Sequence, residues 1–235
     1  MNSDLRITPI GGLGEFGMNS LLLQTGEDRL LVDAGQMFPE WDNGVERMVP
    51  DYGRLGAGRM RAILLTHGHE DHIGSLSQAL EWSKAPVYGT PFTLGLAQRG
   101  LDEAGLEAEL RAIEPGVVIE AGPFRIHSLP VAHSTPGAVA FVIECAGLVI
   151  LHTGDFKLAK TAKASDRTNL EACLGQDVIR RGQLVKPGAG LFAAEAHLID
   201  RGHDQQDAFL SVHRKTIWWK GERDSLPTLG RPQMR

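Results

Sequence analysis

The sequence predicts an α/β or α+β sandwich, a fold in which strands dominate and helices are inserted among them. Short apolar runs with strand-like patterns recur from residue 5 to residue 155, and turns rich in glycine, proline, asparagine or aspartate separate them. Only two segments of this stretch carry apolar residues at helical spacing. This order of elements favours a layered sheet protein over a helical bundle.

The expected strands occupy, in chain order, residues 5–10, 19–25, 29–33, 61–66, 86–89, 106–112, 117–119, 124–130, 139–145 and 148–152. The first helix is expected at residues 71–82, where apolar residues repeat at helical spacing. The second is expected at residues 91–103, with Thr90 as its N-cap and Pro91 as its first helical residue.

The bulk composition is that of a globular protein with 42% hydrophobic residues. No apolar run approaches the roughly 20 residues that span a bilayer, and the N-terminus lacks a secretion signal, so no membrane association is predicted. Two cysteines, Cys145 and Cys173, are too few for a disulfide framework. We interpret both as buried thiols of a reducing compartment, which predicts a cytoplasmic protein.

The charge balance changes sign along the chain. Residues 1–155 carry 10 basic and 20 acidic residues, whereas residues 156–235 carry 14 basic and 9 acidic ones. The second part also lacks a sustained strand or helix period, and its end, 226–232, has the composition of a disordered segment. The sequence therefore predicts a folded first part and a basic tail of different character.

The densest group of candidate metal ligands is HGHEDH at residues 67–72, directly after the apolar run 62–65. Imidazole and carboxylate groups are the ligands that zinc takes in catalytic sites. His67 and His69 alternate and can point to one metal, whereas Asp71 and His72 would face a second. Two neighbouring metals can share a hydroxide that attacks a phosphoryl or acyl centre. The motif therefore predicts metal-assisted hydrolysis.

Further candidates lie where other expected strands end. His133 is expected to complete the first metal site, and Asp155 to bridge the two metals. Asp33 could hydrogen-bond a metal-bound histidine from behind and fix its ring, or it could be an ordinary turn residue. His127 and His152 lie inside strand patterns, and we interpret both as structural.

The glycine-rich stretch 11–17 contains a formal G-x-G-x-x-G match. In dinucleotide-binding proteins this pattern joins a strand to a helix. Here residues 18–25 lead straight to a turn at Gly26 and are too few for a crossover helix. The match therefore predicts no nucleotide cofactor.

Together these residues resemble the metallo-β-lactamase fold, and within it the β-CASP ribonucleases of the ribonuclease J type. The general pattern is Asp33, the motif at 67–72, His133 and Asp155. The narrower resemblance runs from about residue 5 to residue 158 and consists of GGLGEFGMN at 11–19, VDAG at 32–35, FPE at 38–40, LTHGHEDHIG at 65–74, PVYGTP at 86–91 and HTGDFK at 152–157.

The resemblance implies an αββα sandwich that holds two zinc ions. His67, His69 and His133 would hold the first zinc, and Asp71 and His72 the second, with Asp155 between them. The resemblance also implies RNA as the substrate, trimmed from its 5′ end and cut internally by a zinc-bound hydroxide.

The resemblance is not recognisable beyond about residue 158. The family continues with an inserted β-CASP domain, a segment similar to D-S-T-N and a further histidine for the second zinc. We therefore interpret residues 1–158 as the N-terminal part of a metallo-β-lactamase domain, so that the sandwich would be incomplete. Residues 159–235 would be an atypical basic tail, disordered or translated in a shifted reading frame.

Two alternatives stay open. One is a compact single-domain hydrolase of a small ester, thioester or lactone, with His197, His203 or His213 as its last metal ligand. The other is a non-enzymatic remnant that binds zinc. Whether the chain forms a homo-oligomer is also open.

Overall fold

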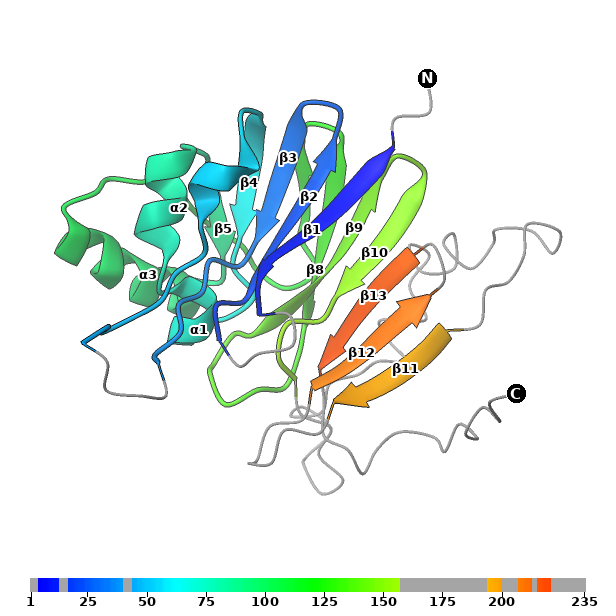
Figure 1. Cartoon of the computed structure of the whole chain (residues 1–235). Coiled ribbons are helices and arrows are strands. Elements are labelled where there is room, and N and C mark those ends of the chain that lie inside the picture. The colour runs from blue at the N-terminus through cyan, green and yellow to red at the C-terminus, as the bar shows by residue number, and fades with distance from the viewer. Residues whose placement is uncertain are drawn as a thin grey trace, which may run out of the picture.

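The computed structural model describes residues 4–12, 17–39 and 44–156, together with the backbone of three later strands, 194–199, 207–212 and 215–220. The described residues form two sheets and a small number of helices (Figure 1). This arrangement confirms the α+β sandwich predicted from the sequence.

The first sheet has six strands in the order β1-β2-β3-β4-β5-β6. Their bounds are Leu5–Gly11, Ser20–Thr25, Asp28–Val32, Arg59–Leu64, Val87–Gly89 and Leu110–Ala112. β1, β2 and β3 pair antiparallel, whereas β3 to β6 pair parallel. The carboxyl ends of β3, β4 and β5 therefore meet at one edge of the sheet, where ligand sites of open sheets lie.

Helices cover one face of this sheet. They are α1 (Glu70–Ile73), α2 (Leu76–Trp82) and α3 (Pro91–Ala104), with a short 3-10 helix, η1, at Tyr52–Leu55. Because side chains alternate along a strand, Leu31 and Ile63 pack against these helices while Leu30 and Leu64 face the opposite way. Burial on both faces explains the unbroken apolar runs of β3 and β4.

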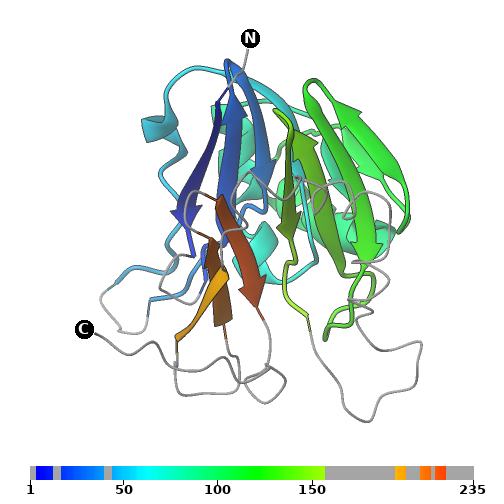
Figure 2. The ribbon, with the colours of Figure 1, turned by 90° about the vertical axis from the view of Figure 1, so that its right-hand side faces the viewer.

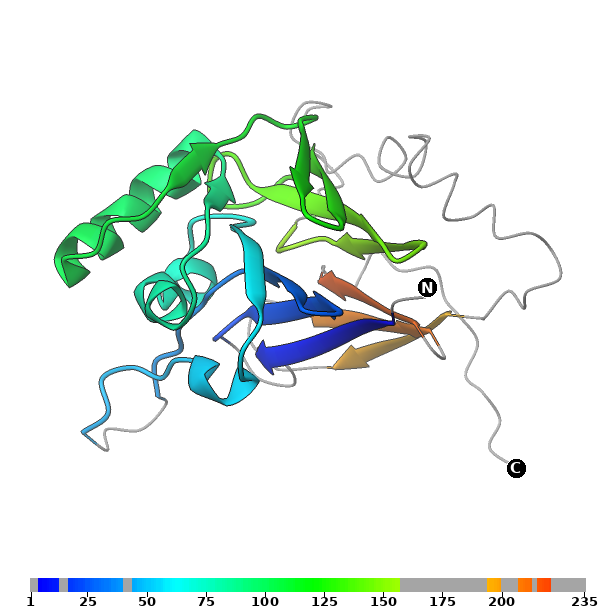
Figure 3. The ribbon, with the colours of Figure 1, turned by 90° about the horizontal axis from the view of Figure 1, so that it is seen from above.

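The second sheet faces the first, as Figures 2 and 3 show, and has the order β11-β12-β13-β10-β9-β8-β7. The bounds of β7 to β10 are Val118–Ala121, Phe124–Pro130, Val139–Cys145 and Leu148–His152. β11 to β13 are Ala194–Ile199, Asp207–Val212 and Lys215–Lys220, and β13 pairs parallel with β10 at His152. Residues 157–193 lie outside the described part, so the division of the chain at residue 158 stays a prediction.

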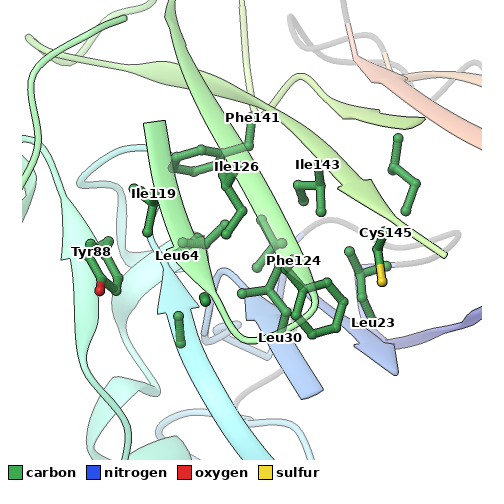
Figure 4. Packing of buried hydrophobic residues seen from close by; sticks show 14 of the residues in the cluster. Leu23, Leu30, Leu64, Tyr88, Ile119, Phe124, Ile126, Phe141, Ile143 and Cys145 are labelled. Carbon is green, nitrogen blue, oxygen red and sulfur yellow. The ribbon is translucent and has the colours of Figure 1, made fainter. Parts of the chain in front are cut away.

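The main core lies between the two sheets (Figure 4). Phe124 and Phe141 of the second sheet are fully buried against Leu30 and Leu64 of the first. Cys145 belongs to this cluster as a free, buried thiol, and its burial raises its pKa above the ordinary value. Cys173 lies outside the described residues.

The expected helix at 71–82 is in fact two helices, and this part of the prediction was wrong. The chain breaks at Gly74 and Ser75 because Ser75 bonds to the loop after β3. Its N–H donates to the carbonyl of Ala34 at 2.8 Å and its hydroxyl donates to that of Gly35 at 2.8 Å. Helical spacing alone does not reveal such tertiary contacts.

The G-x-G-x-x-G stretch is followed by a strand. β2 pairs antiparallel with β1 through Leu5↔Thr25 and the next positions, which confirms that no crossover helix follows the glycines. None of the helices in the described residues is long and apolar enough to cross a membrane.

We predict that Phe141→Ala lowers the free energy of unfolding by about 3–5 kcal/mol, because it leaves a cavity between the sheets. Denaturant unfolding followed by circular dichroism measures this loss. The matched control is Phe92→Ala in α3, whose side chain is 46% exposed and whose loss should cost less than about 0.5 kcal/mol. Equal losses in the two variants would contradict the core described above.

Candidate metal centre

The loops at the carboxyl ends of β3, β4 and β10 meet at one place. Asp33 follows β3, His67 comes after β4, and Asp155 follows β10. A hydrogen bond of 2.9 Å from the N–H of Val139 in β9 to the carbonyl of Thr66 joins the two sheets there. Residues from distant parts of the sequence are thereby brought to a common site.

The first group of candidate ligands consists of His67, His69, His133 and Asp155, whose donor atoms lie within 4.8 Å of one another. His67 Nε2 is 3.0 Å from His69 Nδ1, and His133 Nε2 is 3.2 Å from that same atom. Three ring nitrogens therefore converge on one point.

The second group consists of Asp71, His72 and Asp155, again within 4.8 Å. Asp71 and His72 are adjacent in α1, which begins directly after His69. His72 Nε2 lies 3.6 Å from Asp71 Oδ2 and 3.4 Å from Asp155 Oδ1. The structure thus brings together all six residues singled out in the sequence, while their role as metal ligands stays a prediction.

Asp155 belongs to both groups. Its Oδ1 faces His72 Nε2 at 3.4 Å, and its Oδ2 faces His133 Nε2 at 3.8 Å. Because each carboxylate oxygen is directed toward a different group, Asp155 has the geometry of a carboxylate that bridges two cations.

The two buried histidines His67 and His72 differ in their protonation. Burial, reinforced by the neighbouring His72, lowers the pKa of His67 far below its ordinary value, so its ring is neutral. Burial also opposes charge on His72, but the carboxylates of Asp155 and Asp33 outweigh it and raise the pKa of His72 to about 10. Without a metal, His72 is therefore protonated on both ring nitrogens. A cation bound at Nε2 must replace the proton on that nitrogen.

Asp33 lies behind the ligands and is 1% exposed. Its Oδ2 accepts a hydrogen bond from His72 Nδ1 at 2.8 Å and another from the hydroxyl of Thr66 at 2.9 Å. Asp33 adopts a left-handed conformation, with φ of 61°, and its N–H donates to the carbonyl of Leu64 at 2.8 Å. Of the two sequence interpretations of Asp33, the structure shows the contact with a histidine.

Three polar residues of the site were missed by sequence reasoning. The amide of Asn19 lies 3.1 Å from Asp71 Oδ2 and 3.0 Å from His72 Nε2. The hydroxyl of Ser134 is 3.3 Å from His69 Nε2, and that of Thr66 is 3.0 Å from His67 Nδ1. Adjacency to the ligands in the sequence could have pointed to Ser134 and Thr66. Asn19 lies in the GGLGEFGMN segment that carries the family resemblance, but its distance from the ligands in the sequence gives no hint of these contacts.

The spacing of the ring nitrogens in the first group fits a metal ion. Tetrahedral zinc with bonds of about 2.0–2.1 Å would hold two nitrogens about 3.3 Å apart. The ring-nitrogen separations of 3.0 and 3.2 Å are close to this spacing. The other ring nitrogens of His67 and His69 lie 3.0 and 3.3 Å from hydroxyl oxygens, so each has a polar partner, as the second nitrogen of a metal-bound histidine usually has.

The remaining histidines differ from these. His127 pairs with Glu144 at 2.9 Å, and burial lowers the pKa of His152, whose Nδ1 accepts a hydrogen bond from the N–H of Gly154 at 3.3 Å. Both therefore have structural partners. His197 lies in β11, whose side chains are not described, and His203 and His213 lie outside the described residues.

A family model named for the metallo-beta-lactamase superfamily matches residues 13–172, which is more than half of the chain. The chain belongs to the metallo-beta-lactamase superfamily. A two-sheet fold whose histidines and aspartates gather at one edge agrees with that membership. The fold and the cluster support a metal-dependent hydrolase.

Two curated relatives of this chain are ribonuclease J proteins. A ribonuclease J from Helicobacter pylori is 36% identical over 165 residues, which is 68% of this chain and 24% of the relative. A ribonuclease J 2 from Staphylococcus aureus is 26% identical over 231 residues, covering 92% of this chain and 40% of the relative. Since residues 1–158 make up about two-thirds of the chain, this second match extends past residue 158.

Among solved structures, a protein of unknown function from Enterococcus faecalis V583 aligns with a TM-score of 0.52 at 24% identity, covering 65% of this chain and 43% of that chain. This likeness concerns the fold alone. The chain spans less than half the length of these ribonuclease J relatives.

We predict that Gly35→Ala destabilises the site, because a Cβ at this position would overlap the backbone carbonyl of Asp71. The free energy of unfolding should fall by about 2 kcal/mol or more, as in other overpacked sites. Gly95→Ala in α3 is the control, since nothing lies within 4 Å of its Cβ position and alanine favours a helix by about 0.5–1 kcal/mol. Urea unfolding measures both, and an unchanged Gly35→Ala would contradict the close packing of Asp71 on Gly35.

Proposed function

We propose that this chain holds two zinc ions and hydrolyses RNA phosphodiester bonds, as its similarity to ribonuclease J suggests. The observation that carries the proposal is Asp155, whose two carboxylate oxygens face two separate groups of candidate ligands. His67, His69 and His133 would hold the first zinc and Asp71 and His72 the second, with Asp155 shared.

The ligand chemistry favours zinc. Imidazole and carboxylate donors suit this ion, and the thiol of Cys145 is buried in the core between the sheets. When bound, a pair of metals supplies Lewis acidity and activates water at neutral pH. A free cysteine also fits our proposal of a cytoplasmic enzyme.

The chain's own residues would prepare this chemistry. Asp33 holds the Nδ1 proton of His72, so that Nε2 is directed at the site. Asn19 donates to Asp71 Oδ2 and restrains that carboxylate. Phosphodiesters suit such a centre because two cations can stabilise both the attacking and the leaving oxygen. The similarity to ribonuclease J selects RNA among the phosphodiesters.

The test is the zinc content of the purified chain, together with its hydrolysis of a single-stranded RNA. We expect two zinc ions per chain, and we expect His69→Ala to lose zinc and to lower the hydrolysis rate at least about 100-fold. His127→Ala is the matched control, because His127 pairs with Glu144 away from the candidate ligands. This variant should keep both metals and its activity.

Other outcomes would contradict the proposal. A wild-type chain that binds no zinc would refute the metal centre. Two zinc ions without RNA hydrolysis, but with hydrolysis of an ester, thioester or lactone, would refute the substrate and favour the compact hydrolase. Zinc binding with no hydrolysis of any of these substrates would leave a zinc-binding remnant.

A further inference from the structure

Thr66 lies at the centre of the hydrogen bonds behind the candidate ligands. It is completely buried, as is His67, the next residue. Its backbone N–H donates to Asp33 Oδ1 at 2.8 Å, and its hydroxyl donates to Asp33 Oδ2 at 2.9 Å. The same hydroxyl oxygen is 3.0 Å from His67 Nδ1. Thr66 therefore connects Asp33 with His67.

The hydrogen count fixes the direction of these bonds. A hydroxyl has one hydrogen to donate, and the hydroxyl of Thr66 donates it to the carboxylate oxygen Oδ2 of Asp33. The hydrogen of Thr66 therefore goes to Asp33, so His67 Nδ1 must be the donor toward Thr66. The neutral ring of His67 then carries its proton on Nδ1, and its bare Nε2 faces His69 Nδ1 at 3.0 Å.

His72 is held by the same carboxylate. Its Nδ1 lies 2.8 Å from Asp33 Oδ2 but 3.4 Å from the hydroxyl of Thr66, so Asp33 is its main partner. One carboxylate thus orients a histidine of the second group directly and a histidine of the first group through Thr66.

We propose that Thr66 is a positioning residue that carries the orienting effect of Asp33 to His67 and so fixes which ring nitrogen of His67 faces the metal. This inference rests on the proposed metal centre. Such indirect partners typically change metal affinity by about 10- to 100-fold when they are removed.

The surroundings of Thr66 keep its side chain in place. Gly154, with φ of +55°, leaves room for it, since a Cβ at Gly154 would come within 2.8 Å of Thr66 Cβ. The Thr66 carbonyl also accepts the N–H of Val139 at 2.9 Å. Both sheets therefore hold Thr66, which suits a residue that sets the orientation of another.

The test compares Thr66→Val, which keeps the shape but removes the hydroxyl, with Thr66→Ser, which keeps the hydroxyl. Zinc affinity is measured in the full chain by competition with a chelator. We expect Thr66→Val to bind the first zinc about 10- to 100-fold more weakly, and Thr66→Ser to stay within about threefold of the wild type. Equal affinity of wild type and Thr66→Val, or an equal loss in both variants, would overturn the inference.

A second measurement does not depend on the variants folding. Nitrogen NMR of the metal-free wild type reports which ring nitrogen of His67 carries the proton. A proton on Nδ1 supports the inference, and a proton on Nε2 overturns it. Because this result is independent of zinc, a wild type that binds no zinc would refute the proposed function without deciding the proton position of His67.

Discussion

The buried carboxylate of Asp33 accepts hydrogen bonds from the backbone and hydroxyl of Thr66 and from His72. These bonds connect the end of β3 with the loop after β4 and with α1. An unpaired charge at this depth would be costly, so each of its partners must be present for the loops to pack as they do. Asp33 also has a left-handed backbone conformation, which is strained for a residue other than glycine. Its hydrogen bonds hold it in that conformation.

The site built on this carboxylate has two unlike halves. In the first, ring nitrogens of His67 and His133 lie 3.0 and 3.2 Å from His69 Nδ1, and burial keeps the ring of His67 neutral. In the second, a protonated His72 lies among carboxylates. A cation would be bound by the converging ring nitrogens in the first half and would replace a proton of His72 in the second. The two halves therefore provide different electrostatic reasons to bind a metal, and Asp155 connects them.

Much of this could be predicted from local sequence. The strands β9 and β10 have the predicted bounds, and the ligands of the H-x-H-x-D-H motif are adjacent because their spacing is short. His133 and Asp155 were found because each follows an apolar strand. The break in the first helix and the contacts of Asn19 depend on residues far away in the sequence, such as Ala34 and Asp71. No local pattern encodes them.

The charge change after residue 155 predicts a tail of different character, and this stays a prediction. The alignment with the Staphylococcus aureus relative extends past residue 158. The charge composition of a segment indicates how well it is solvated, but it does not show which strands the segment forms or with which strands they pair. The tail histidines could be named as candidates from the sequence, and their side chains lie outside the described part of the structure.

X-ray absorption at the zinc edge of the zinc-loaded chain tests the central claim most directly, because it reports the atoms that surround the metal. The expected spectrum has nitrogen and oxygen neighbours at about 2.0–2.1 Å, with the additional scattering that imidazole rings produce. Sulfur neighbours at about 2.3 Å, or a spectrum without imidazole scattering, would show that zinc binds elsewhere and would contradict a centre built on Asp33, the histidines and Asp155.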